Sequence, residues 1–210
     1  MNIIFDLDGT LIDSSKGILN AVDLAFQQCT VELQQPLTPN LIGPPLTQLL
    51  PLLSGTDDPK VIAQLSDAFK EGYDMEGYKK TEIFEGVSEM LELLFKKGCS
   101  LYIATNKRII PTRKIIDFFA WTGFFQGIYA LDMFDGLATK AELIERVISL
   151  HNMDDTPMIY VGDTVADRSA AKANDVAYIM VSWGYDFEER TNEIHVDTVK
   201  ELKSYILELS

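Results

Sequence analysis

At 210 residues, with 47% hydrophobic and 24% charged residues, the chain has the size and composition of one large globular domain or a core with a smaller module. Its 18 basic and 32 acidic residues give a formal net charge of -14, which argues against partners such as nucleic acid or a membrane surface. The same charge repels an anionic small substrate, so a phosphate site in this protein needs a local cation.

The N-terminus and the cysteines indicate a cytoplasmic protein. Met1 leads directly into the strand-like segment 2–5, without the basic start and long apolar run of a signal peptide. No stretch approaches the apolar length of a membrane span. Cys29 and Cys99 lack metal-ligand spacing and are best interpreted as reduced core residues.

Apolar runs alternate with helical periodicity over much of the chain. The expected strands are 3–5, 100–105, 128–131, 158–161 and 176–181. The expected helices are 85–97, 139–150, 165–173 and 198–207. A further helix is expected to have Pro111 in its first turn and to run to about Phe119. This alternation predicts an α/β fold, a parallel sheet covered by helices on both faces with right-handed connections.

Residues 14–80 break this alternation. Two helices are expected there, Lys16–Cys29 and Asp58–Met75, and a proline-rich stretch from residue 35 to 51 separates them. We interpret the segment as a helical cap inserted after the first strand. The predicted division is therefore a core of residues 1–13 and 81–210 and a cap of residues 14–80.

The first chemical motif is Asp6-Leu7-Asp8-Gly9-Thr10, directly after an apolar strand. Because side chains two apart in extended backbone point the same way, Asp6 and Asp8 can share one site. One carboxylate can then attack phosphorus while the other handles protons. The alternative is a structural turn, which Asp and Gly also commonly form at strand ends.

The second motif is Gly162-Asp163-Thr164-Val165-Ala166-Asp167, again after an apolar strand. Taken alone, Asp163 also suits a loop or an N-cap, and Asp167 also suits the first turn of a helix. If the strand ends adjoin, however, four carboxylates meet, and two like charges about 4 Å apart repel by roughly 4 kcal/mol. A divalent cation resolves that conflict, and an all-oxygen ligand set without paired His or Cys favours Mg²⁺ over zinc.

Three further residues complete the predicted site. Thr105 and Asn106 follow another strand and can donate hydrogen bonds to phosphoryl oxygens, and Lys140 can offset their charge. Each also has an ordinary structural interpretation, a strand-end turn for the pair and a solvated helix start for Lys140. Lys107 and Arg108 are alternative sources of the positive charge.

The motifs at Asp6–Thr10, Thr105–Lys107, Lys140 and Gly162–Asp167 resemble, in order and spacing, the haloacid dehalogenase superfamily of hydrolases. The insert, Leu41–Leu46 and Ser182–Tyr185 resemble its phosphoglycolate phosphatase-like branch. The resemblance implies a Rossmann-like core sheet with a small helical cap. Ala138-Thr139 before Lys140 departs from the Lys-Pro context common at that motif.

The resemblance also implies roles for the site residues. Asp6 is the expected nucleophile and a magnesium ligand. Asp8 is the expected acid and base, with its carbonyl on the metal. Lys140 links the phosphoryl group, held by Thr105 and Asn106, to Asp6. The expected metal ligands are Asp6, Asp8, Asp163 and Asp167, with Asp167 acting directly or through water.

The cap is expected to close over the site, with Gly43 and Pro44 as candidate substrate-binding residues or as a rigid turn between helices. The expected function is magnesium-dependent hydrolysis of a small phosphorylated metabolite: phosphoglycolate, a sugar phosphate or a nucleoside monophosphate. A phosphomutase, or a phosphate-binding module without turnover, is the alternative. The protein is expected to be a monomer or a small homo-oligomer.

Overall fold

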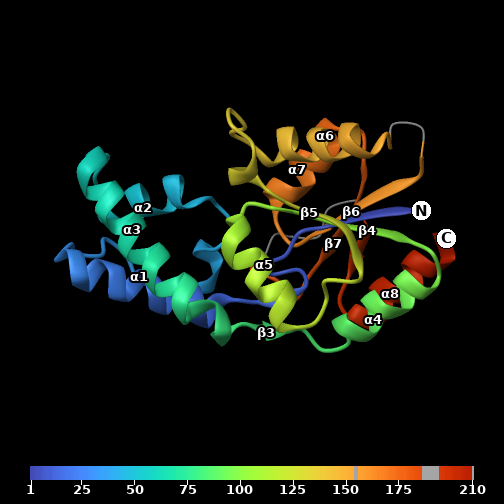
Figure 1. Ribbon diagram of the computed structural model, residues 1–210, viewed down its shortest axis with the longest axis horizontal. Helices are drawn as coiled ribbons and strands as arrows, with labels where there is room; N and C mark the ends of the chain where they lie inside the picture. Colours follow the sequence, from blue (N-terminus) through green and yellow to red (C-terminus); the bar gives the residue numbers. More distant parts are fainter. Residues whose placement is uncertain (154–155, 186–193, 210) are drawn as a thin grey trace. The chain divides into compact units, whose positions relative to one another are not determined.

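The computed structural model describes residues 1–153, 156–185 and 194–209 and divides the chain into two compact units. The core unit comprises Met1–Asp13 and Ile83–Ser210, and the helical unit comprises Ser14–Glu82 (Figure 1). The sequence predicted boundaries after residues 13 and 80. In the structure the chain passes between the units after Asp13 and after Glu82.

The core unit contains a six-stranded parallel sheet in the order β5-β4-β1-β6-β7-β8. Its strands are β1 (Asn2–Phe5), β4 (Ser100–Thr105), β5 (Phe125–Ala130), β6 (Met158–Gly162), β7 (Ala177–Val181) and β8 (Ile194–Val196). The near-continuous apolar runs predicted the first five because both faces of a parallel sheet are buried. β8 was missed because it has three residues, with His195 between two apolar ones.

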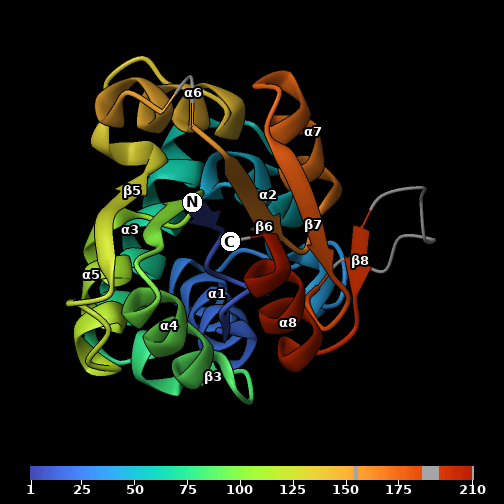
Figure 2. The same ribbon diagram turned by 90° about the vertical axis from the view of Figure 1, so that its right-hand side faces the viewer.

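The helices of the core unit cover both faces of this sheet (Figure 2). They are α4 (Val87–Lys96), α5 (Ile109–Phe118), α6 (Lys140–His151), α7 (Val165–Ala173) and α8 (Val199–Leu209), with the 3-10 helix η3 (Leu131–Met133). The helices α6 and α7 pack together on one face, and α4 and α8 pack together on the other. The predicted α/β Rossmann-like fold is confirmed, and no helix end differs from its predicted residue by more than two positions.

The buried core between α6, α7 and the sheet contains several tyrosines as well as aliphatic side chains. Tyr102, Tyr160 and Tyr178 belong to it, together with Ile4 of the central strand and residues of both helices. A buried tyrosine usually needs a hydrogen-bond partner for its hydroxyl. The partners of Tyr160 and Tyr178 lie at the carboxyl end of the sheet.

The helical unit consists of α1 (Ser15–Cys29), α2 (Leu46–Ser54) and α3 (Pro59–Met75), with the 3-10 helices η1 (Pro39–Leu41) and η2 (Gly77–Lys80). The predicted helices correspond to α1 and α3, which pack on each other. The helix α2 was not predicted because it contains Pro51, which removes a backbone donor. Burial of Leu49, Leu50 and Leu53 compensates for that loss.

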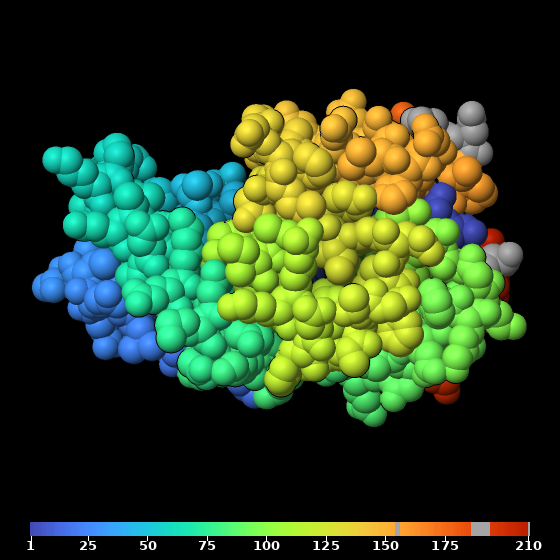
Figure 3. All heavy atoms as spheres, in the orientation of Figure 1, coloured from blue at the N-terminus to red at the C-terminus, as the bar shows by residue number. Residues whose placement is uncertain are grey.

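Two short strands, β2 (Ile12–Asp13) and β3 (Glu82–Ile83), pair where the chain passes between the units. On the face drawn in Figure 3, α5 and the segment that leads through β5 toward α6 form much of the surface of the core unit. Among the described helices, none combines the length and hydrophobicity of a membrane-spanning segment.

Candidate active site

Three neighbouring strands deliver polar residues to one edge of the sheet. Asp6 follows β1, Thr105 is the last residue of β4, and Asp163 follows β6. Because β1 lies between β4 and β6 and all three are parallel, their carboxyl ends adjoin.

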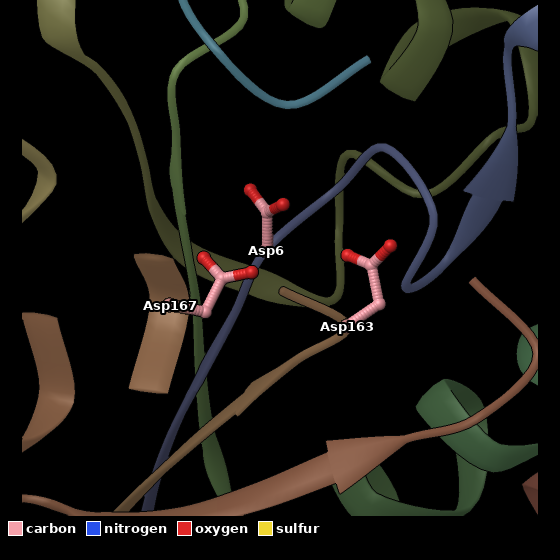
Figure 4. A group of neighbouring side chains, drawn as sticks. All are labelled: Asp6, Asp163 and Asp167. Atoms are coloured by element: carbon pink, nitrogen blue, oxygen red, sulfur yellow. The ribbon is translucent and has the colours of Figure 1, made fainter. Parts of the chain in front are cut away.

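Asp6, Asp163 and Asp167 form a cluster of buried carboxylates. One oxygen from each lies within 4.8 Å of one oxygen from each of the others. Figure 4 shows the three side chains, Asp6 after β1 and Asp163 and Asp167 after β6, gathered around one space. Asp163 and Asp167 are fully buried and Asp6 is 5% exposed.

The Asp163 carboxylate is held by two loops. The hydroxyl of Thr10 donates to its Oδ1 at 3.3 Å, and the backbone N–H of Tyr185 donates to its Oδ2 at 2.8 Å. Gly9 and Gly184 approach so closely that a Cβ atom on either would lie 2.1 or 2.2 Å from an Asp163 atom. The indole N–H of Trp183 donates to the Thr10 carbonyl, which ties the two loops together.

Asp167 accepts protein donors on both carboxylate oxygens. It lies in the first turn of α7, where Thr164 is the N-cap and forms a reciprocal capping box with it. The Thr164 hydroxyl and N–H donate to Oδ2 at 2.6 and 3.1 Å. Oδ1 lies 2.5 Å from the Lys140 ammonium and 3.2 Å from the Tyr160 hydroxyl.

Lys140 is a buried cation between two of these carboxylates. Its Nζ lies 3.0 Å from Oδ1 of Asp6 and 2.5 Å from Oδ1 of Asp167. It is the first residue of α6, whose N-cap Thr139 forms a capping box with Glu142. Helix capping therefore fixes the backbone from which this ammonium extends.

Burial and neighbouring charge shift the pKa values of these groups. Burial raises the pKa of Asp6 to about 7, although Lys140 acts in the opposite direction. Burial, with the charges of Asp167 and Asp6, raises the pKa of Asp163 well above its usual value. Burial lowers the pKa of Lys140, but the carboxylates of Asp167 and Asp6 outweigh it and raise that pKa.

The side chain of Asp8 does not join the cluster of three carboxylates. Both its oxygens lie near the Lys107 ammonium, at 3.0 and 3.2 Å. Lys107 and Arg108 were the alternative sources of positive charge for the phosphate. In the structure Lys140 pairs with Asp6, and Lys107 pairs with Asp8. The predicted crowding of four carboxylate side chains is therefore reduced to three.

The remaining predicted residues occupy several positions. Thr105 is buried at the end of β4 and its hydroxyl accepts a hydrogen bond from the Lys107 N–H, while Asn106 is half-buried. Gly43 and Pro44 belong to the helical unit, between η1 and α2, and their role stays a prediction. The His151 ring contacts the Tyr129 hydroxyl.

The carboxylate cluster fits a hard divalent cation. Oδ1 of Asp6 is buried, and its polar neighbour among the described residues is the Lys140 ammonium at 3.0 Å, which leaves this oxygen able to accept a second positive partner. The three residues of the cluster offer only oxygen ligands. Such a set suits a cation of the magnesium or calcium type.

A family model described as haloacid dehalogenase-like hydrolase matches residues 3–181. The chain belongs to the haloacid dehalogenase-like hydrolases. A 5'-nucleotidase of Pseudomonas aeruginosa is 33% identical over 90% of this chain and 85% of its own length. A phosphoglycolate phosphatase of Vibrio vulnificus strain YJ016 is 28% identical over 99% of this chain and 94% of its own.

The solved structure of a predicted phosphatase from Clostridium acetobutylicum covers 99% of this chain and 98% of its own, with a TM-score of 0.87 and 26% identity. The tyrosine-protein kinase PtkA of Mycobacterium tuberculosis strain H37Rv is 26% identical over 96% of this chain and 70% of its own. The chain lies in the phosphoglycolate phosphatase-like branch of the haloacid dehalogenase-like hydrolases and is a phosphoric monoester hydrolase, as its motifs predicted.

Sequence reasoning did not assign functional positions to Thr10, Tyr160 or Thr164. Thr164 could have been found, because a threonine three residues before an acid is a capping-box pattern. Tyr160 lies in an apolar strand, where the sequence does not distinguish a core tyrosine from one that reaches a carboxylate. In this hydrolase only the packing of β4, β6 and α7 reveals it.

Proposed function

We propose that this protein is a magnesium-dependent phosphatase that hydrolyses a small phosphate monoester through a phospho-aspartate on Asp6. The observation that carries the proposal is the buried cluster of Asp6, Asp163 and Asp167 with the Lys140 ammonium between Asp6 and Asp167. Three buried acids and one buried cation form a negative centre, which suits a divalent cation together with a phosphoryl group.

In the first step, a carboxylate oxygen of Asp6 attacks phosphorus and the bond to the leaving-group oxygen breaks. Asp8, two residues further along the chain, donates a proton to that oxygen. In the second step Asp8 accepts a proton from water as the water attacks the phospho-aspartate, which releases inorganic phosphate and restores Asp6.

The other residues hold and neutralise the transferred group. The Thr105 hydroxyl and the Asn106 amide are proposed to donate hydrogen bonds to phosphoryl oxygens, and Lys140 to offset their charge. Magnesium would be held by Asp6, Asp163 and the Asp8 carbonyl. When bound, it supplies positive charge that orients the phosphoryl group and stabilises the transition state.

Asp167 is proposed to act on the metal through water. Each of its oxygens already accepts a hydrogen bond from a protein group. This arrangement supports a role in orienting Lys140 more than direct ligation of a cation. The outer partners of metal ligands often fix the ligands in this way.

The proposed substrate is a small monoester, with nucleoside monophosphates tested before phosphoglycolate and sugar phosphates. The order follows from the relatives, since the 5'-nucleotidase has the higher identity. Gly43 and Pro44 are proposed to bind the substrate. A cytoplasmic location and a monomer or small homo-oligomer stay predictions.

The test is phosphate release from a panel of these substrates, with and without Mg²⁺. Wild type is expected to release phosphate only with the metal, and Asp6→Asn is expected to lose turnover by several orders of magnitude. Asp175→Asn is the matched control, because Asp175 is exposed and its left-handed backbone tolerates Asn. Equal phosphate release by wild type and Asp6→Asn would exclude Asp6 as the nucleophile.

The same panel separates hydrolysis from phosphoryl transfer between positions of one molecule. A phosphatase yields inorganic phosphate equal to the monoester consumed. A phosphomutase yields isomerised substrate without matching phosphate release, which ³¹P NMR detects. Binding of phosphate without either product would indicate the non-catalytic module.

A further inference from the structure

The hydroxyl of Tyr160 lies beneath the carboxylate cluster in a fully buried position. It donates its single proton between two acceptors, the Ala104 carbonyl at 2.9 Å and Oδ1 of Asp167 at 3.2 Å. These acceptors belong to β4 and α7, whereas Tyr160 belongs to β6. One hydroxyl therefore joins three elements of the core unit.

The bridge passes across the strand that carries the proposed nucleophile. β1 separates β4 from β6 in the sheet, so the Tyr160 side chain reaches over β1 to the Ala104 carbonyl. Phe5 is opposite Ile103 in the β1–β4 register, so the next residues, Asp6 and Ala104, lie at the same level. Ala104 also immediately precedes Thr105.

We propose that Tyr160 is a positioning residue: its hydroxyl fixes the Asp167 carboxylate against the end of β4 and thereby holds the Lys140 ammonium opposite Asp6. The inference rests on the proposed function. Oδ1 of Asp167 carries both contacts, since Lys140 lies 2.5 Å from it and Tyr160 lies 3.2 Å from it. A rotated Asp167 carboxylate would draw the ammonium away from Asp6.

The packing of the ring alone does not account for tyrosine at this position. Its ring stacks on Tyr178 with centroids 6.4 Å apart, a contact that phenylalanine would also make. A hydroxyl in an apolar core is unfavourable unless it is hydrogen-bonded. The Tyr160 hydroxyl is satisfied by groups of the active site, so its removal is expected to change catalysis more than packing.

The test compares Tyr160→Phe with Tyr102→Phe. Tyr102 is a matched control because it is a buried tyrosine of the same core cluster on β4, two residues before Ala104. With the panel's best substrate and saturating Mg²⁺, Tyr160→Phe is expected to lower kcat about tenfold with little change in KM. Tyr102→Phe is expected to leave kcat near the wild-type value.

A loss of kcat below about threefold for Tyr160→Phe would overturn the proposal, because so small a loss would show that Lys140 stays opposite Asp6 without the Tyr160 hydroxyl. An equal loss of kcat for Tyr102→Phe would also overturn the proposal, because it would show that removing any tyrosine hydroxyl from this core lowers kcat. Circular dichroism and Tm verify that both variants are folded, and assays at 10 °C replace those at 25 °C if Tm falls strongly.

A double-mutant cycle with Asp167→Asn identifies the route of the effect. The measured quantity is the single-turnover rate of phospho-enzyme formation. Because Tyr160 acts through Asp167, Tyr160→Phe is expected to lower this rate little further in a protein that already carries Asp167→Asn. Independent, multiplicative effects would overturn the proposal. Failure of wild type to turn over any substrate would instead contradict the proposed function.

Discussion

At the scale of single residues, the site depends on two glycines as much as on its acids. Asp163 lies between Gly9 and Gly184, which belong to segments far apart in the sequence. A Cβ on Gly184 would lie 2.2 Å from the Asp163 Cβ and 2.3 Å from its Oδ2. Any side chain there must displace the carboxylate that is proposed to bind the metal.

We therefore expect Gly184→Ala to lower kcat/KM at least tenfold, because outer-shell disturbance of a metal site has that magnitude. Overpacking should also lower the free energy of unfolding by about 1–3 kcal/mol. Gly123→Ala is the control, since a Cβ at Gly123 meets nothing within 4 Å. Wild-type kinetics for Gly184→Ala, measured beside denaturant unfolding, would contradict this account of Asp163.

At the scale of elements, helix starts position the charged groups. Thr139 caps α6 and so fixes the backbone of Lys140, and Thr164 caps α7 and so fixes Asp167. Thr198 makes the same type of contact with Glu201 at the start of α8, away from the carboxylates. The chain thus contains two similar helix caps, Thr139 next to a site residue and Thr198 away from the site.

Thr139→Ala and Thr198→Ala are both expected to lower the free energy of unfolding by about 1 kcal/mol, the usual value of an N-cap. For a chain of this size that corresponds to a fall in Tm of about 2–4 °C. Only Thr139→Ala is expected to lower kcat as well, because Lys140 follows it directly. Loss of kcat in both variants, or in neither, would show that capping does not position the ammonium.

The elements also show where sequence patterns are sufficient. The sequence predicted α4, α6 and α7 to within two residues; α4 and α6 each bury one apolar face, and Gly98 follows the end of α4. The helix α2 was missed since Pro51 masked its periodicity, and its stability comes from burial within the helical unit. Tertiary packing overrides local propensity in such segments.

At the scale of the whole molecule, the buried acids make stability depend on pH. The pKa of Asp6 is about 7 and that of Asp163 is also raised, whereas both are near 3.8 in an unfolded chain. Between those values the folded state binds more protons than the unfolded state. The free energy of unfolding of the metal-free protein is therefore expected to fall as pH rises from about 4 to 7.

The expected slope is up to about 1.4 kcal/mol per pH unit for each of the two groups. Lys140 does not oppose it, because its raised pKa keeps it charged throughout this range. Mg²⁺ competes with these protons, so it should raise Tm more at pH 8 than at pH 5.5. Calorimetry across pH, with Asp6→Asn as the non-titrating control, tests both expectations. Equal metal stabilisation at both pH values would contradict them.

The sequence by itself determined the parallel α/β core, the family, and the acids and lysine at the strand and helix ends. It could do so because buried strands, helix periodicity and strand-end motifs are local patterns. Only the tertiary structure decided that Lys107 pairs with Asp8, that Gly184 packs against Asp163, and that Tyr160 contacts Asp167 and reaches across β1 to Ala104. Those contacts join residues far apart in the chain or on different elements, so their distances exist only once the sheet and its helices have packed.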